Sequence, residues 1–528
     1  MDFRAHRPQT RLGRSERSLV KIAEELTRFL SKAQRSLAFD TLHLSNRKRE
    51  ILAHILVEFA EDLYQDIGIW GSLERYNLEF FGTKLPCILQ PDEAMDAELM
   101  NPARVQFLLW TLYSDLAPDL ILAPNHQDLE QLALEIAEFL QERIAHVQYD
   151  SGVKTFLTMP NQYGWDAKIK LVWLGQHSYL FRLSCEQYIR THGGTPDIPT
   201  LDDFLCQANT CWSGLGVIDM LAATLDIPES QRHDLRSWYE RHTGYFRVLS
   251  AHVPLMEVQN ILNDQVYTVR VDERARQFHA HRLVFGGLVP WDGAWYWSGM
   301  QRGFATVTEE MIAQVKQDFR VQAPQIVYRY CGDLAAKARE LVGKHYQQFM
   351  EYHGKDLVIY PDGHTMADDM RKFHQYQFDS APKQDVEAFL KKYHLARPSP
   401  RIELPPDILE CDDGVGVYCN PDEGQEMMTS FKDVINGFQK QGKRLNEDES
   451  EMIRQLLYSD AISPKFVRAL VQKYGDASIG SAFLIPQDYD KHYLEYLLRR
   501  YKGHFYRKRY PSITIVDTPS EATSHPHL

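Results

Sequence analysis

The sequence predicts an α+β protein that is mostly α-helical, with a small antiparallel β-sheet or barrel module near its middle. Apolar residues recur every three or four positions through most of the first 240 residues, which is the spacing of one helix face. Between about residues 243 and 306 the pattern changes to alternation, which is typical of half-buried strands. Asp292-Gly293, between two apolar runs, adds a hairpin signal, because both residues tolerate the positive φ of a tight turn.

Helices are expected throughout the N-terminal part. Ser45 can cap a helix whose apolar stripe runs from Leu52 to Leu63, and a second stripe runs from Leu129 to Ile144. The Gly193-Gly194-Thr195-Pro196 turn precedes further helices up to about His242. These stripes predict packing faces rather than cofactor sites.

Strands are expected at Tyr245–Leu249 and Gln265–Val271, and helices resume near Thr308. Two more short strands are predicted at Asp356–Tyr360 and Gly414–Tyr418. Ser463-Pro464 and Gly475 delimit a late helix, as an N-cap with its first-turn proline and a C-terminal glycine.

The order of these elements predicts five parts. They are an N-terminal helical domain (1–240), a β-rich module (243–306), a helical segment with a short strand (307–397), a C-terminal α+β subdomain (408–515) and a polar, disordered tail (516–528). A chain of 528 residues is too long for one core, so several domains are required.

Composition excludes some functional classes. The net charge of −13 argues against a surface built wholly for nucleic acid or anionic lipid, although local basic patches remain open. The seven cysteines contain no Cys-x-x-Cys pair, which disfavours a zinc ribbon or a disulfide framework. The N-terminus lacks the apolar core of a signal peptide, and no apolar run approaches the roughly 20 residues that span a bilayer. A cytoplasmic protein with no membrane contact is therefore expected.

Several short motifs occur in a characteristic order. They are Gly68-Ile69-Trp70 with Tyr76–Gly82 and Leu85-Pro86, Trp173-Leu174 with Ser178–Phe181, Leu288–Pro290 with Trp297–Gly299, Tyr418–Pro421 with Gly424 and Glu426, Ile462–Pro464, and Leu494–Lys502. In this order the chain resembles a family of uncharacterised bacterial proteins, common in Bacteroides relatives and known as a domain of unknown function. The resemblance implies no agreed activity, cofactor or catalytic residue. The chain departs from it at Asp422 and Glu423, where basic residues would be expected before Gly424.

The sequence contains one candidate for hydrolytic or metal-dependent chemistry. His364 and Asp368 lie four residues apart, with Asp369 beside them, so one helix face would bring the imidazole and a carboxylate together. Such a pair can orient a general base or bind a metal. The alternative, which is favoured, is an ordinary helix start rich in acids.

Other motifs are incomplete. Gly437 and Gly442-Lys443 have P-loop spacing, but Arg444 replaces the hydroxyl residue that holds magnesium. His279 and His281 share a face of an expected strand without further metal ligands, so no metal site and no cofactor are predicted.

The stretch from Arg499 to Tyr510 alternates cations with aromatic residues and contains no acid. Cations bind phosphates and aromatic rings stack on bases, so this stretch is a candidate for nucleic-acid binding. Packing of a helix stripe against the core is the alternative. Its six cations are Arg499, Arg500, Lys502, Arg507, Lys508 and Arg509.

The sequence thus favours a binding protein without catalytic activity, in which the β-rich module and adjoining helices meet an unknown protein partner. Nucleic-acid binding through the C-terminal stretch is the first alternative, and a hydrolase or metal-dependent enzyme centred on His364 and Asp368 is the second. The partner, the oligomeric state and the biological process are not encoded in any recognisable pattern.

Overall fold

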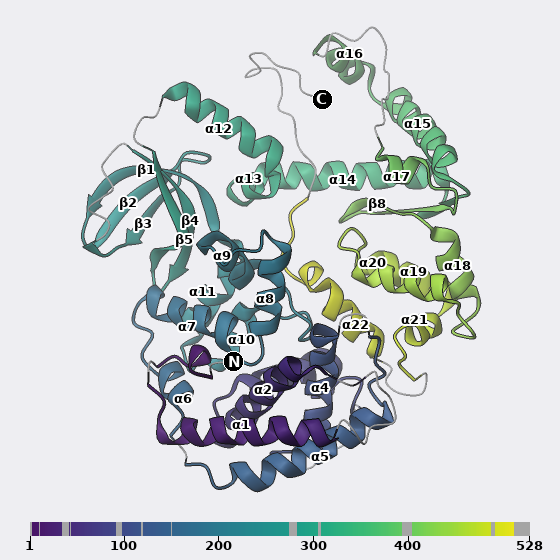
Figure 1. The fold of residues 1–528 in the computed structure, drawn as a ribbon. Helices are drawn as coiled ribbons and strands as arrows, with labels where there is room; N and C mark the ends of the chain where they lie inside the picture. The colour runs from purple at the N-terminus through teal and green to yellow at the C-terminus, as the bar shows by residue number, and fades with distance from the viewer. Residues whose placement is uncertain are drawn as a thin grey trace. The chain divides into compact units, whose positions relative to one another are not determined.

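The computed structural model describes residues 3–9, 11–33, 42, 44–90, 95, 98–117, 120–148, 150–273, 282–304, 308–392, 404–486 and 492–511. The chain divides into two compact units (Figure 1). The first comprises Met1–Asn260, Gln265–Thr306 and Phe483–Tyr506, and the second comprises Ile261–Asp264, Val307–Ala482 and Arg507–Leu528. The predicted α+β class is confirmed. The limits of the five predicted parts stay a prediction, since the first unit holds both the N-terminal helices and the β-rich module.

The first unit is largely helical. Its helices are η1 (Phe3–His6), α1 (Arg14–Ala33), α2 (Asn46–Gln65), α3 (Ile69–Phe81), α4 (Pro102–Leu116), α5 (Gln127–Ile144), α6 (Gly152–Leu157), α7 (Gly164–His177), α8 (Arg182–Thr191), α9 (Ile198–Gln207), α10 (Val217–Thr224), α11 (Glu229–Ser237), η3 (Trp238–Glu240), α22 (Tyr493–Lys502) and η5 (Gly503–Tyr506). Ser45 caps α2 by accepting a hydrogen bond from the Lys48 amide, as predicted.

The late helix α22 belongs to this N-terminal core. The Tyr496 ring stacks on Trp110 of α4 at 5.7 Å between ring centroids and meets the edge of Phe81 at 5.5 Å. A Cβ at Gly214 would overlap the carbonyl oxygen of Arg499, so glycine is what lets the end of α22 approach.

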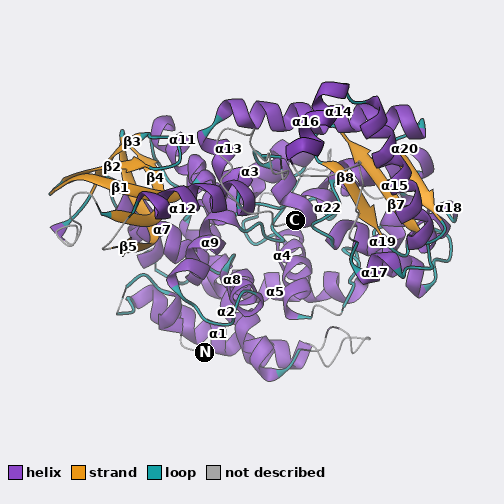
Figure 2. Cartoon of the chain, turned by 90° about the horizontal axis from the view of Figure 1, so that it is seen from above, coloured by secondary structure: helices purple, strands orange, loops and turns teal. Residues whose placement is uncertain are grey.

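The β-rich module, hereafter the β module, contains the other five elements of the first unit. They are β1 (His242–His252), β2 (Leu255–Asn260), β3 (Val266–Arg270), β4 (Leu283–Trp291) and β5 (Ala294–Phe304), and they pair in the closed order β1-β2-β3-β5-β4. Asp292 and Gly293 form the predicted hairpin turn, with φ of 49° and 77°. Figure 2 draws these strands in orange.

The module differs from a purely antiparallel sheet at one seam, where β3 and β5 run parallel through a single residue pair, Val269 and Trp295. Five strands in a ring cannot all alternate in direction, so one neighbouring pair must be parallel. The module's core is apolar and includes Phe246, Val258 and Tyr267.

The second unit packs helices on both faces of a three-stranded sheet. Its elements are α12 (Glu309–Gln322), α13 (Pro324–Tyr330), α14 (Gly332–His353), β6 (Leu357–Tyr360), α15 (Gly363–Ser380), α16 (Lys383–Lys392), α17 (Pro406–Leu409), β7 (Val415–Asn420), β8 (Gly424–Met428), α18 (Phe431–Gln439), α19 (Glu447–Tyr458), α20 (Pro464–Tyr474) and α21 (Ala477–Ala482). Along the central strand β7, Val417 faces the cluster formed with α14 and α15, whereas Tyr418 stacks on Phe466 of α20 at 4.9 Å. Every residue of β7 is therefore buried.

Two further observations concern the cysteines and the helices. All seven cysteines are free thiols. Within the described ranges, no helix combines the length and apolar character that crossing a bilayer demands.

Candidate functional site

The predicted His364 and Asp368 pair does not converge on a site. Asp362 caps α15 by accepting a hydrogen bond from the Thr365 amide at 2.7 Å. His364 and Asp368 are exposed on the helix, and Asp368 forms an ion pair with Arg371 at 2.7 Å. Among the described residues, no three side chains of the metal-binding types come together.

Asp369, in contrast, points inward and holds tyrosines. Its carboxylate accepts hydrogen bonds from the Tyr360 hydroxyl at 2.6 Å and the Tyr352 hydroxyl at 3.3 Å. Burial, followed by the Asp369 hydrogen bond, raises the pKa of Tyr360 well above its usual value. Burial also lowers the pKa of His353, whose Nδ1 lies 3.7 Å from Asp369. These contacts tie β6 and α14 to α15, which is a structural role.

The basic C-terminal stretch is turned mainly into the protein. Arg500 is buried and donates hydrogen bonds to the Tyr496 hydroxyl at 2.9 Å and Ser114 at 2.8 Å. Lys502 is also buried, and the guanidinium of Arg499 lies 3.7 Å from the centre of the Phe80 ring. This geometry favours the packing alternative for these three cations.

The remaining cations of the stretch belong to the second unit. Arg509 is exposed but forms an ion pair with Glu423 at 2.8 Å, and the ammonium of the exposed Lys508 lies 5.3 Å from the Tyr510 ring. Arg507 is half-buried. Phosphate binding by these residues stays a prediction. His279 and His281 lie outside the described residues.

A buried ionic network in the first unit was not anticipated from the sequence. Arg7 pairs with Glu61 at 2.6 Å, and Arg182 pairs with Glu58 at the same distance. Glu61 also accepts a hydrogen bond from Ser151. The network could be found only in three dimensions, because its members lie on α2, at the start of α8, just after η1 and at the N-cap of α6.

Burial dominates the electrostatics of this network. It lowers the pKa of His6 to about 3 and that of His54 to about 4, and it raises the pKa of Glu58. Asp62 has its pKa raised to about 6 by burial, against four hydrogen bonds that favour its charged form. Within the described residues, the Arg7 and Arg182 Nε atoms have no hydrogen-bond partner. The adjoining cavity is about 10 Å³, which is roughly one water molecule.

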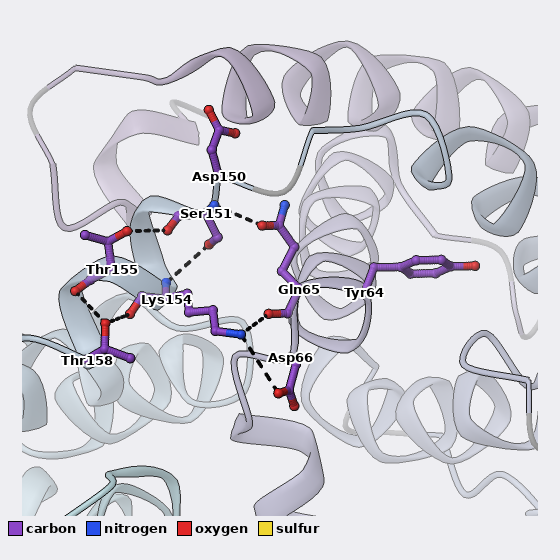
Figure 3. Close-up of a pocket in the computed structure, with 8 residues that line it drawn as sticks. All are labelled: Tyr64, Gln65, Asp66, Asp150, Ser151, Lys154, Thr155 and Thr158. Atoms are coloured by element: carbon purple, nitrogen blue, oxygen red, sulfur yellow. Dashed lines mark hydrogen bonds and ion pairs between the residues drawn. The ribbon is translucent and has the colours of Figure 1, made fainter.

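An open surface pocket of about 560 Å³ lies beside this network, between the end of α2 and α6 (Figure 3). Lys154 points across it and donates to the Gln65 carbonyl oxygen at 2.8 Å, while its ammonium lies 3.9 Å from Asp66. Tyr64 points away from these residues. Because the lysine charge is already paired, the pocket has no evident ligand chemistry.

Two surface features of the β module are more distinctive. The first, here called the α7 band, comprises Tyr163, Trp165 and Ile169 at the start of α7, Arg270 of β3 and Leu255 of β2. Tyr163 and Trp165 have ring centroids 4.8 Å apart, and the Arg270 guanidinium lies 5.4 Å from the Tyr163 ring. Leu255 is directly opposite Arg270 in the β2–β3 ladder.

A buried ion cluster fixes the β module against the helices. Asp202 of α9 forms ion pairs with Lys168 of α7 and with Arg241, and it accepts a hydrogen bond from Ser298 of β5 at 3.0 Å. Burial alone would raise the pKa of Asp202, but Lys168 and Arg241 lower it below its usual value. Asp202 thus links α7, which carries Trp165 and Ile169, to β5 of the β module.

The second feature, here called the aromatic-arginine patch, comprises Tyr245 and Arg247 of β1, Phe285 of β4, and Arg302 and Phe304 of β5. Tyr245 is opposite Phe285, and Phe285 is opposite Arg302, so the three form a row across the sheet. The sequence reading missed this patch, because its residues meet only through strand register.

Comparison with known proteins is informative for the N-terminal part. No curated protein and no solved structure matches the chain. The resemblance to an uncharacterised family has support within the first unit, whereas the motifs from Leu288 onward lie beyond the matched stretch. Residues 2–204 match the family described as protein of unknown function (DUF3843).

Proposed function

We propose that the protein is a binding protein without catalytic activity, and that its α7 band receives a protein partner. The observation that carries this proposal is the exposure of large apolar side chains along the band. Trp165 is 37% exposed, Leu255 42% and Ile169 58%. Trp, Tyr and Arg dominate the binding energy of protein interfaces, and all three occur here.

The chemistry of the band specifies the partner's surface. Apolar side chains would cover Trp165 and Ile169, and a carboxylate would face the Arg270 guanidinium at the edge. The two alternatives have less support. His364 and Asp368 do not converge, and Arg500 and Lys502 are buried.

Site-specific crosslinking tests this proposal. A photoreactive benzoylphenylalanine replaces Ile169 in the full chain inside the producing cell, and irradiation is expected to give one discrete adduct. Trp165→Ala and Arg270→Glu should each reduce its yield about tenfold, which corresponds to 1.4 kcal/mol. A lysine that replaces the partner's facing carboxylate should restore the yield with Arg270→Glu.

The matched control carries the photoreactive residue at Leu134 of α5, which is 46% exposed. It should give no such adduct. The proposal is wrong if the adduct forms equally from both positions, or if neither variant changes its yield. An adduct of twice the chain mass would identify a second copy as the partner.

A further inference from the structure

The outer face of β1, β4 and β5 carries the aromatic-arginine patch in two adjoining rows. The first row is Tyr245, Phe285 and Arg302. In the second, Arg247 is opposite the buried Leu283, which is opposite Phe304. Residues paired across strands or two apart along a strand share one face, so both rows lie on the same surface.

This surface is the outside of the module. The alternate residues Phe246 and Val284 belong to the apolar core, which fixes the opposite orientation for Tyr245 and Phe285. Tyr245, Phe285 and Phe304 are half-buried, whereas Arg302 is exposed. Each ring therefore packs on the module with part of its surface and exposes the rest to solvent.

The rings and cations are close enough to act together. The Tyr245 ring centroid lies 5.0 Å from that of Phe285 and 5.6 Å from that of Phe304. The Arg302 guanidinium lies 5.5 Å from the Phe304 ring. Aromatic faces beside guanidinium groups are the two components of a site for single-stranded nucleic acid.

The local charge favours a polyanion. Strands β1, β4 and β5 contain no Asp or Glu, although the whole chain has a net charge of −13. On the same face, the neighbouring strand β2 carries one acid, Glu257, which flanks the second row and accepts a hydrogen bond from Ser250 of β1 at 3.3 Å. A positive patch on an acidic protein localises phosphate binding to this face.

We propose that the aromatic-arginine patch binds single-stranded nucleic acid. Bases stack on Tyr245, Phe285 and Phe304, and the guanidinium groups of Arg247 and Arg302 contact phosphates. Unpaired strands are selected because bases inside a duplex cannot present their faces to the rings. The patch is separate from the α7 band, so this site does not depend on a protein partner.

Fluorescence anisotropy of labelled U12 and dT12 oligonucleotides with the full chain tests the site. Binding is expected at 50 mM salt and should weaken with a log-log slope of about −1.4, for two phosphates on a single strand. Arg302→Glu should reduce the affinity about tenfold or more and should make the salt dependence less steep. Tyr245→Leu and Phe304→Leu, which keep apolar bulk but remove the ring, should each cost about fivefold or more.

The matched control is Arg28→Glu, which makes the same charge change at an exposed position of α1. It should reduce affinity about threefold or less, with circular dichroism confirming that every variant folds. Failure of both oligonucleotides to bind at 50 mM salt would overturn the proposal, as would equal losses for Arg28→Glu and Arg302→Glu. Displacement by polyglutamate as effective as by unlabelled oligonucleotide would also overturn it, because an acidic protein would then be the natural ligand.

Discussion

Asp62 shows how one buried carboxylate can organise a helix start. It accepts hydrogen bonds from the amides of Gly68 and Trp70 at 2.8 and 2.6 Å and from the Tyr179 hydroxyl at 2.7 Å. Without it, the two amides at the beginning of α3 would be unsatisfied. These hydrogen bonds thus offset part of the cost of burying the carboxylate.

Replacing this carboxylate by an amide is expected to be costly. Asp62→Asn should lower the free energy of unfolding by about 2 kcal/mol, because an amide donor would face backbone donors. Asp66→Asn, at the exposed end of α2 where φ is 50°, should change it by less than about 0.5 kcal/mol. Urea unfolding of both variants measures this, and equal effects would contradict the assigned role.

His54 should make the first unit sensitive to acid. Its pKa of about 4 lies below the usual value of 6.5, so the folded state binds its proton less readily than the unfolded state. The stabilisation is present above pH 6.5 and is lost as the pH falls towards 4. Asp62 and Glu58, with raised pKa values, contribute in the opposite direction.

A variant isolates the histidine from these opposing groups. The stability of the wild type relative to His54→Gln should fall between pH 6.5 and 4.5, because the contributions of Asp62 and Glu58 are common to both proteins. Urea midpoints across this range provide the measurement. Parallel pH curves for the two proteins would refute the assignment.

At the scale of elements, Asp202 fastens β5 to α7 and α9. Removing its charge would leave Lys168 and Arg241 without their main counter-ion, and unpaired buried charges are costly. Asp202→Asn should therefore lower the free energy of unfolding by about 3 kcal/mol. Asp203→Asn, which also removes a carboxylate from Arg241 but at a half-exposed position, should cost about 1 kcal/mol or less. Thermal unfolding of the two variants tests this role of Asp202. A general effect of charge would instead make the two losses of stability equal.

Sequence reasoning located many elements because their signals are local. The Ser45 cap, the Asp292-Gly293 turn and the helix from Pro464 to Tyr474 each depend on neighbouring residues. It missed β2 and β8. In β8, the charged residue Glu426 is buried, which a sequence pattern does not predict. Glu426 is satisfied by Asn420 and by the distant Ser463 amide, both at 2.7 Å, and no local pattern announces that partner.

The candidate sites divide in the same way. His364 and Asp368 are correctly placed on one helix, but spacing does not reveal whether a helix face meets solvent or a cleft. Likewise, alternation of Arg and Tyr in the C-terminal stretch does not distinguish stacking on bases from stacking on the protein's own rings. The aromatic-arginine patch required the register that joins β1, β4 and β5.

At the scale of the whole molecule, the contact between Gly214 and α22 joins distant parts of the chain. Gly214→Ala should loosen α22, because the added Cβ would overlap the Arg499 carbonyl oxygen. Gly193→Ala also places an alanine at a positive φ, which is 103° at Gly193 and 70° at Gly214. Its Cβ, however, would meet no atom within 4 Å. Amide hydrogen exchange across residues 493–506 should rise about tenfold or more only in the first variant. A similar rise in both variants would mean that strain, rather than the contact, is responsible.

The position of Tyr496 has a consequence for biosynthesis. Phe81 and Trp110, which pack around its ring, leave the ribosome long before the tyrosine is made, since translation adds roughly 5 to 20 residues per second. The nascent N-terminal part must therefore persist with the space for this ring unfilled while Val307–Ala482 of the second unit are synthesised. Chaperone dependence should be greatest during that interval and should end when α22 emerges and Tyr496 packs between Phe81 and Trp110.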